Sequence, residues 1–413
     1  MNPPSPAESP ATGASRHQRV VCFVNGVYTK HIGGGDIYFT HIIRGVIDAG
    51  FPVHFFGGHA LEWFLKFQNL PLNLTLTDRR IADLGDASSF GGQIRLFGDY
   101  VRRVFGTLPR LKEVHREDIA FVVSDFWWDT IPFLLSRSTR KILYLGMMAP
   151  SLKEVIFRTR ADVPRSRIAS LHYWFTQQFS LRCFRFCRKG FVTYGHPEMH
   201  EYLLRFGYRE SQMTSVPNAI DVPTVDRVPP QPKQFDIAWT GRIHAQKGID
   251  DLLATLKWLG EQIPDFRAVI IGKSKNTLEP IIREMGLAAN VTFSGLVSEE
   301  EKFRLLKASR VFVMPSHYES WGIVVGEAVA AGTAVVAYEL QCYPSVFGNF
   351  ARYVKPFDME AFKKAVEDEV RDQRAGKNYL AGMDLEKLKR SLSWQASQEA
   401  FNKLLAEVEK VPV

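Results

Sequence analysis

Short, uninterrupted apolar segments alternate with helical stretches along the whole chain, and no other feature restricts the fold as much. Each segment is rich in Val, Ile and aromatic residues, which is typical of strands buried on both faces of a parallel sheet. The stretch after the first segment has helical spacing and predicts a helix that is capped by Asp36 and ends at Gly50. The segments of the first half are residues 20–25, 52–58, 119–125, 141–146 and 190–195.

The alternation restarts after a predicted linker at residues 225–234, which contains three prolines and few apolar residues. The strand-like segments that follow read FDIAWTG, RAVIIG, VTFSG, VFVMPS and AVVAYE. The 413 residues are enough for two or three domains, each with its own core. Two successive βα series therefore predict an α/β protein with two Rossmann-like, doubly wound domains.

The chain divides into four predicted parts. Residues 1–18 are rich in Pro, Ser and Ala and have no apolar core segment, so we expect a disordered tail and no signal peptide. The first domain is expected at 19–220 and the second at 221–392. Residues 393–413 have a helical pattern with no strand after it, and we expect this helix to return to the first domain. No run of 18 apolar residues predicts a membrane-spanning helix.

The positive charge of the chain lies in its first half. Residues 1–220 carry 27 Lys and Arg against 18 Asp and Glu, whereas residues 221–413 carry 25 against 26. Such a field suits nucleic acid, an anionic lipid surface or an acidic substrate, and the alternative interpretation is a basic domain with no specific partner. The four cysteines lack the spacing of a metal site, so we expect reduced thiols, no metal and a cytoplasmic protein.

Three segments have the residue types of a phosphate or sugar site. The first, VNGVYTKHIGGGD, runs from a strand end near Asn25 through Gly33, Gly34 and Gly35 into a helix. Glycines let the backbone approach a ligand, and the N–H groups at a helix N-terminus suit phosphate. The spacing is not that of a dinucleotide fingerprint, and a flexible surface loop is the alternative interpretation.

The second segment is TGRIHAQKGIDDLL, in which Arg242 and Lys247 surround a loop that opens a helix. Two cations at a helix N-terminus favour a diphosphate, although two solvated charges would give the same pattern. The third is PSHYESWGIVVGEAV, with Glu319 on a loop after a strand and Glu327 more than one turn into the next helix. These carboxylates could bond sugar hydroxyls, act as an acid–base pair or be solvated.

Together these segments resemble retaining glycosyltransferases of family 4, the glycosyl transferases group 1 with the GT-B fold. Residues 241–253 (GRIHAQKGIDDLL) resemble the family's G-R-x4-K-G-x3-L motif, and 319–327 (ESWGIVVGE) its E-x7-E motif. Residues 216–221 (VPNAID) resemble its P-N-G-V-D hinge, and 392–394 (LSW) the start of its closing helix. The similarity extends from about residue 20 to the end and is most specific in the second domain.

This resemblance implies roles for the residues of the motifs. Arg242 and Lys247 would hold the diphosphate of a nucleotide-sugar donor, and Gly34 and Gly35 would close over the phosphate from the first domain. The reaction would need no metal and no other cofactor.

The resemblance also implies the contacts of the donor's sugars. Glu327 would bond the ribose hydroxyls, and Glu319 the hydroxyls of the transferred sugar. Three backbone N–H groups would lie nearby, those of Trp321, Gly322 and Ile323.

The first domain of the family often carries a histidine after its fourth strand, close to the reacting sugar. Here that position reads SDFWWD. We assign the role to Asp125, with Ser124 and Asp129 as open alternatives, and count Asp125 and Glu319 as the candidate catalytic residues.

The resemblance thus implies a hexosyltransferase (EC 2.4) that moves a sugar, with retained configuration, to a glycan, glycolipid or small molecule in polysaccharide or glycoconjugate biosynthesis. Two alternatives remain open, a GT-B nucleotide-sugar epimerase and a non-catalytic binding subunit. The intact set of Arg242, Lys247, Glu319 and Glu327 argues against a decayed site.

Residues 151–190 hold nine Lys and Arg against two acidic residues, interleaved with Trp and Phe. One interpretation is peripheral contact with the anionic inner face of a membrane. The other is a helix with a solvated basic face and an aromatic core face. Single-stranded nucleic acid also uses such mixtures, but we expect no specific nucleic-acid partner.

Overall fold

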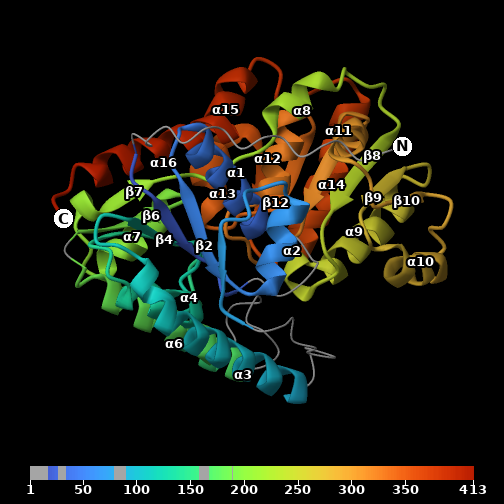
Figure 1. The fold of residues 1–413 in the computed structure, drawn as a ribbon. Coiled ribbons are helices and arrows are strands. Elements are labelled where there is room, and N and C mark those ends of the chain that lie inside the picture. The colour runs from blue at the N-terminus through green and yellow to red at the C-terminus, as the bar shows by residue number, and fades with distance from the viewer. Residues whose placement is uncertain (1–16, 27–33, 79–89, 158–166, 188) are drawn as a thin grey trace, which may run out of the picture.

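The computed structural model describes residues 17–26, 34–78, 90–157, 167–187 and 189–413. It confirms two α/β domains, each built on a parallel sheet with helices on both faces (Figure 1). The first sheet has the strand order β3-β2-β1-β4-β5-β6-β7, and the second β10-β9-β8-β11-β12-β13.

The first sheet contains all five strands that its apolar segments predict, and two short strands at its edges. The edge strands β3 and β7 have three residues each and were missed, because so short a run has no clear apolar pattern. The strands are β1 (Val20–Phe23), β2 (Val53–Gly57), β3 (Leu74–Leu76), β4 (Ile119–Val122), β5 (Arg140–Tyr144), β6 (Gly190–Tyr194) and β7 (Met213–Ser215).

Seven α-helices of the first domain lie within the described residues. The predicted start of the first helix, with Asp36 as its cap, was wrong, because α1 begins at Gly34. Asp36 instead lies in the first turn of α1, where its carboxylate complements the helix dipole. The helices are α1 (Gly34–Asp48), α2 (His59–Phe67), α3 (Phe90–Thr107), α4 (Trp127–Leu135), α5 (Leu152–Phe157), α6 (Arg167–Phe184) and α7 (Pro197–Arg205).

The second sheet likewise contains the five predicted strands and a short edge strand that was missed. Its strands are β8 (Phe235–Thr240), β9 (Ala268–Ile271), β10 (Val291–Gly295), β11 (Ser309–Met314), β12 (Ala334–Tyr338) and β13 (Arg352–Val354). Its helices are α9 (Ile249–Gln262), α10 (Lys275–Glu284), α11 (Glu299–Lys307), α12 (Ile323–Ala330), α13 (Cys342–Phe347), α14 (Met359–Arg374) and α15 (Leu385–Ser391).

The chain crosses between the domains at two neighbouring points, where Ile220 pairs with Ser393. The predicted linker was wrong in its first three residues, which belong to α8 (Val222–Arg227). The side chain of Asp221 caps this helix by accepting a hydrogen bond from the N–H of Thr224 at 3.2 Å. This cap allows a helix in a segment that the prolines at 229, 230 and 232 led us to predict as a linker.

The last helix, α16 (Trp394–Glu409), returns to the first domain as predicted and packs along α1 (Figure 1). Its apolar face joins the core of the first sheet through Trp394, Phe401 and Leu404. Of the predicted tail, residues 1–16 lie outside the described part, whereas Gln18 donates its N–H to Glu409 of α16 at 2.8 Å.

Candidate functional site

The loops that follow β8 and β11 lie together at the carboxyl edge of the second sheet, because these two strands are neighbours. Gln246 ties the loops, since its carbonyl accepts the N–H of His317 at 2.8 Å and its amide donates to the carbonyl of Tyr318 at 2.9 Å. The second and third sequence motifs therefore meet in space. Lys247 forms an ion pair with Glu319, and both side chains are largely buried.

Two glycines make this close meeting possible. Gly248 has φ +61°, and a Cβ there would lie 1.9 Å from the carbonyl oxygen of Pro315. Gly322 has φ +85°, and a Cβ there would lie 2.5 Å from the ring of Tyr343. Each glycine directly precedes a helix, α9 or α12, so both helix N-termini open at the same edge of the sheet as the motif residues.

Arg242 lies on the loop after β8, three residues before the short 3-10 turn Ala245–Lys247, and it is exposed. Among the described residues, no carboxylate forms an ion pair with it. The site therefore presents one exposed guanidinium, and one ammonium that is neutralised by Glu319.

Glu327 is 6% exposed and lies inside α12. Its Oε1 is 2.7 Å from the ammonium of Lys302 on α11, whereas its buried Oε2 has no hydrogen-bond partner among the described residues. Burial raises the pKa of Glu327, and the charge of Lys302 opposes that rise. A buried oxygen without a donor is costly, so a ligand hydroxyl at Oε2 would be stabilising.

Lys302 was missed by the sequence reasoning. Burial lowers its pKa, but the carboxylates of Glu327 and Glu299 more than offset this effect, and the net pKa is raised. The ammonium therefore stays charged beside Glu327. Nothing in the run EEEK distinguishes this lysine from a solvated one, because its partner lies 25 positions away.

The N-terminus of α12 meets the first domain. Gly322 caps this helix without a side-chain hydrogen bond, Trp321 is buried beside it, and Ile323 is its first residue. A Cβ on Gly34, the first residue of α1, would lie 3.3 Å from Cδ1 of Ile323, whereas Gly35 has open space around its Cα. The N-termini of α1 and α12 thus approach each other across the domain junction, and Gly33 with the rest of 27–33 lies outside the described residues.

Asp125 follows β4 and is 3% exposed. Burial raises the pKa of its carboxyl to about 6, against a hydrogen bond from the amide of Gln177. The same amide donates to the carbonyl of Met147 at 2.7 Å, and the next carbonyl, of Met148, accepts the hydroxyl of Tyr318 at 3.1 Å. A short chain of contacts therefore connects Asp125 with the residue before Glu319.

The two alternatives to Asp125 have contacts within the first domain. Asp129 is 1% exposed and accepts the backbone N–H of Asn25 at 2.5 Å, and Ser124 donates to its other oxygen. Burial raises the pKa of Asp129 to about 7, although these hydrogen bonds oppose the rise. Asp129 therefore anchors the end of β1.

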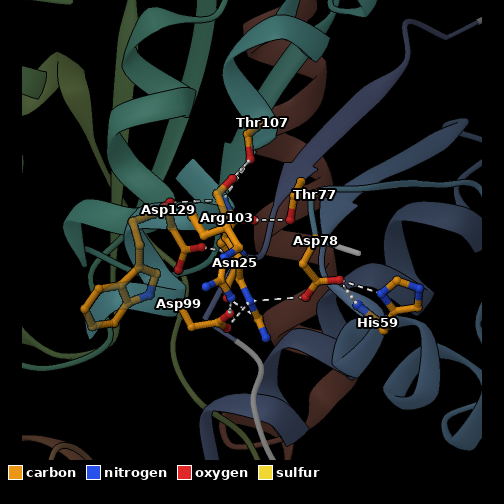
Figure 2. A network of polar contacts seen from close by, with 10 residues as sticks. Asn25, His59, Thr77, Asp78, Asp99, Arg103, Thr107 and Asp129 are labelled. Carbon is orange, nitrogen blue, oxygen red and sulfur yellow. Dashed lines mark hydrogen bonds and ion pairs between the residues drawn. The ribbon is translucent and has the colours of Figure 1, made fainter. Parts of the chain in front are cut away.

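A buried polar network beside Asp129 was also missed by the sequence reasoning (Figure 2). At its centre the fully buried guanidinium of Arg103 contacts Asp99 at 3.0 Å and Asp78 at 3.3 Å, and donates to the carbonyl of Asn25 at 2.8 Å. It joins the ends of β1 and β3 to α3. The only sequence signal is the four-residue spacing of Asp99 and Arg103 on a helix.

In the part of the chain that the structure describes, no helix has the length and apolar content needed to cross a bilayer. Over the same ranges, no three His, Cys, Asp or Glu side chains gather in a way that would hold a metal ion.

Comparison with known proteins finds a family model that matches most of the second domain. Residues 224–381 match the family model of glycosyl transferases group 1. A phosphatidyl-myo-inositol mannosyltransferase of Mycolicibacterium smegmatis is 32% identical over 184 residues, which are 41% of this chain and 46% of that protein. A mannosylfructose-phosphate synthase of Agrobacterium fabrum is 28% identical over 40% of this chain and 39% of its own. The chain thus spans less than half the length of these two relatives.

Solved structures match nearly the whole chain. Sucrose-phosphate synthase from Thermosynechococcus elongatus has a TM-score of 0.69 at 18% identity, with 95% of this chain and 99% of that one covered. Anabaena HepE in complex with UDP and glucose has a TM-score of 0.64 at 13% identity, with 95% and 100% covered. At such identities the likeness establishes the GT-B fold. The part of this GT-B chain that carries Arg242, Lys247, Glu319 and Glu327 therefore matches the group 1 glycosyl transferases.

Proposed function

We propose that the protein is a retaining hexosyltransferase of family 4 that uses a nucleoside-diphosphate sugar and no metal. The observation that carries the proposal is the meeting of Lys247 and Glu319 at one edge of the second sheet, within the region that matches the family model. A solved structure with the same fold supports the donor class, since HepE was solved with UDP and glucose. The acceptor is proposed to be a glycan, glycolipid or small molecule of glycoconjugate biosynthesis.

The ion pair between Lys247 and Glu319 suggests how the donor enters. Without a ligand the two groups neutralise each other in a largely buried place. A diphosphate would accept hydrogen bonds from the Lys247 ammonium, and a sugar hydroxyl would donate one to the Glu319 carboxylate. Each side chain would therefore exchange its bond within the ion pair for a charged hydrogen bond to the donor. Arg242 would bind the same diphosphate, and the free Oε2 of Glu327 would accept a ribose hydroxyl.

In the transfer step, the bond between the anomeric carbon and the diphosphate oxygen breaks. The acceptor oxygen bonds that carbon from the same face, and its proton goes to the departing diphosphate. Negative charge develops on the diphosphate, where Arg242, Lys247 and the N-termini of α1 and α12 would stabilise it. Asp125 would approach the reacting sugar from the first domain.

A binding-only subunit would keep the donor contacts without turnover, and a GT-B epimerase would release no transferred sugar. Binding is therefore tested first. Replacing Arg242 by alanine is expected to weaken nucleoside diphosphate binding about 10- to 150-fold, which corresponds to the roughly 1.5–3 kcal/mol of a charged hydrogen bond. Isothermal titration with UDP, GDP and ADP measures this, and Arg283→Ala on α10, also exposed, is the control. Equal affinities for wild type and Arg242→Ala would remove Arg242 from the diphosphate site.

We also propose that the protein works in the cytoplasm, at the inner face of an anionic membrane. The support comes from α6, whose outward side carries Phe175 (64% exposed) and Phe179 (36%), with Phe186 (74%) just beyond its end. The buried side of this helix is polar at Thr176 and Gln177, whereas Leu181 and Phe184 nearer its end join the apolar core. The expectation of an aromatic core face was therefore wrong for Phe175, Phe179 and Phe186 and right for Phe184. An exposed apolar strip of this kind suits a membrane interface.

Guanidinium groups accompany this strip. Arg182 and Arg185 line a cavity of about 300 Å³ together with Arg205, Phe186 and Phe206. Among the described residues, no carboxylate pairs with Arg182 or Arg185, so their charges are available to lipid phosphates. Of the other basic residues predicted for this surface, Arg158, Arg160, Arg165 and Arg188 lie outside the described part.

The membrane proposal predicts flotation with anionic but not neutral vesicles, weakened by salt, since each cation near such a surface contributes about 1 kcal/mol. Phe175→Ser is expected to reduce flotation. Phe67→Ser, on α2 and 61% exposed, is the matched control and should float like wild type. If the protein ignores anionic vesicles at low salt, or if both variants float equally, the α6 strip is not a membrane contact.

A further inference from the structure

The loop that carries Glu319 is held from both domains. On its own side it is tied to Gln246, as described above. Toward the first domain, the hydroxyl of Tyr318 donates to the carbonyl of Met148 at 3.1 Å. The position of the Glu319 carboxylate therefore depends on how the first domain sits against this loop.

A second contact from the first domain reaches the other end of the loop. His196 follows β6 and directly precedes α7, and its ring is 3% exposed. Burial lowers the pKa of this imidazole, and Glu198 and the nearby backbone of Ser320, the residue after Glu319, oppose that shift. A Cβ on the preceding Gly195 would lie 4.0 Å from the indole of Trp321, so this stretch packs directly against the loop. Glu319 thus lies between two contacts with the first domain.

Glu198 extends this connection to a second element of the second domain, α13. Its Oε2 is 2.8 Å from Nδ1 of His196 and accepts the hydroxyl of Ser345, on α13, at 2.9 Å. Pro197 fixes the start of α7, and the His196 side chain makes no cap hydrogen bond to that helix. The imidazole of His196 therefore does not cap α7 and lies at the junction between the two domains.

We propose that His196 and Glu198 form a clasp between the domains that positions the Glu319 loop for the transferred sugar. The clasp consists of His196 and Glu198 from the first domain with Ser320 and Ser345 from the second. In this proposal His196 and Glu198 are positioning residues, because they act through the loop that carries Glu319. The proposal rests on the proposed transferase function for its effect on activity, but the contacts it assigns do not.

A variant that lacks the imidazole of His196 should differ from wild type in one property and match it in another. The diphosphate contacts of Arg242 and Lys247 lie on the loop after β8, so nucleoside diphosphate affinity should not change. The loop at 318–322 would lose one of its two ties to the first domain, and Glu319 would spend less time in its productive place. A misplacement of about 1 Å in a positioned group can cost 10²-fold in rate.

The test compares His196→Ala, His196→Gln and His200→Ala. His200 is the matched control, since it lies on α7, the helix that His196 precedes, and its ring is 2.8 Å from Glu210, another first-domain residue. His196→Ala is expected to lower kcat about 10- to 100-fold with unchanged diphosphate affinity. His196→Gln keeps a side-chain donor and should recover part of the loss, and His200→Ala should behave as wild type.

Amide hydrogen exchange tests the clasp without any substrate. His196→Ala should speed exchange in peptides that cover 318–322 and leave those around Arg242 unchanged. If exchange at 318–322 is unchanged, the clasp does not hold the loop, whatever the activity. If exchange rises as expected but wild type turns over no donor, the clasp stands and the proposed function fails. Equal losses of kcat in His196→Ala and His200→Ala would also overturn the clasp.

Discussion

Lys247→Ala is expected to lower kcat by about 10²- to 10³-fold, the usual cost of removing one group that stabilises developing charge. The ammonium lies at the N-terminal end of α9 beside Glu319, where the proposed leaving diphosphate gains its charge. The variant would also leave the largely buried Glu319 side chain without its ion-pair partner. Initial rates at saturating donor measure the effect.

Lys257→Ala is the control for this variant, because Lys257 is an exposed lysine on the same helix. It should retain wild-type kcat. Equal rates for the two variants would show that Lys247 does not stabilise the leaving diphosphate, and they would contradict the proposed mechanism.

Arg103→Leu is expected to lower the free energy of unfolding by about 3–5 kcal/mol, the cost of breaking a buried ion pair by removing one partner. The substitution leaves Asp78 and Asp99 buried without the guanidinium that both contact (Figure 2). It also removes the donor to the carbonyl of Asn25, at the end of β1. Urea unfolding, with the m-value checked for two-state behaviour, gives the difference.

The neighbouring arginine provides the control for this loss of stability. Arg102 contacts the same Asp99 at 3.1 Å, but its side chain is 69% exposed, and exposed pairs contribute about 0–1 kcal/mol. Arg102→Leu should therefore unfold nearly like wild type. Similar losses in the two variants would show that the network is not what stabilises this edge of the sheet.

The long strands and the order of the two domains follow from the sequence because apolar runs of four or more residues can be buried only in a few ways. The edge strands β3, β7 and β13 do not follow from it. Each has three residues and owes its conformation to a neighbouring strand rather than to its own pattern. The start of α1 was misjudged for a related reason, since Asp36 resembles a cap but helical geometry begins at the glycines.

The meeting of Lys247 and Glu319 was also predictable, because both follow neighbouring strands of one parallel sheet and lie at the same edge. Lys302, Gln177 and His196 were not. Each acts on a residue far away in the chain, and each sits in a local sequence that would suit a solvated side chain equally well. On α6 the local pattern was misleading in part, because the helix buries Thr176 and Gln177 and exposes Phe175 and Phe179, although Phe184 is buried as expected.

The most direct test of the account is to incubate the wild-type protein with UDP-, GDP- and ADP-sugars and follow the sugar by proton NMR. The account predicts that one donor is consumed, that nucleoside diphosphate is released, and that the first sugar product keeps the donor's anomeric configuration. An inverted first product would contradict the retaining mechanism. If no donor in the panel is consumed or bound, the proposal that this site handles nucleotide sugars is wrong.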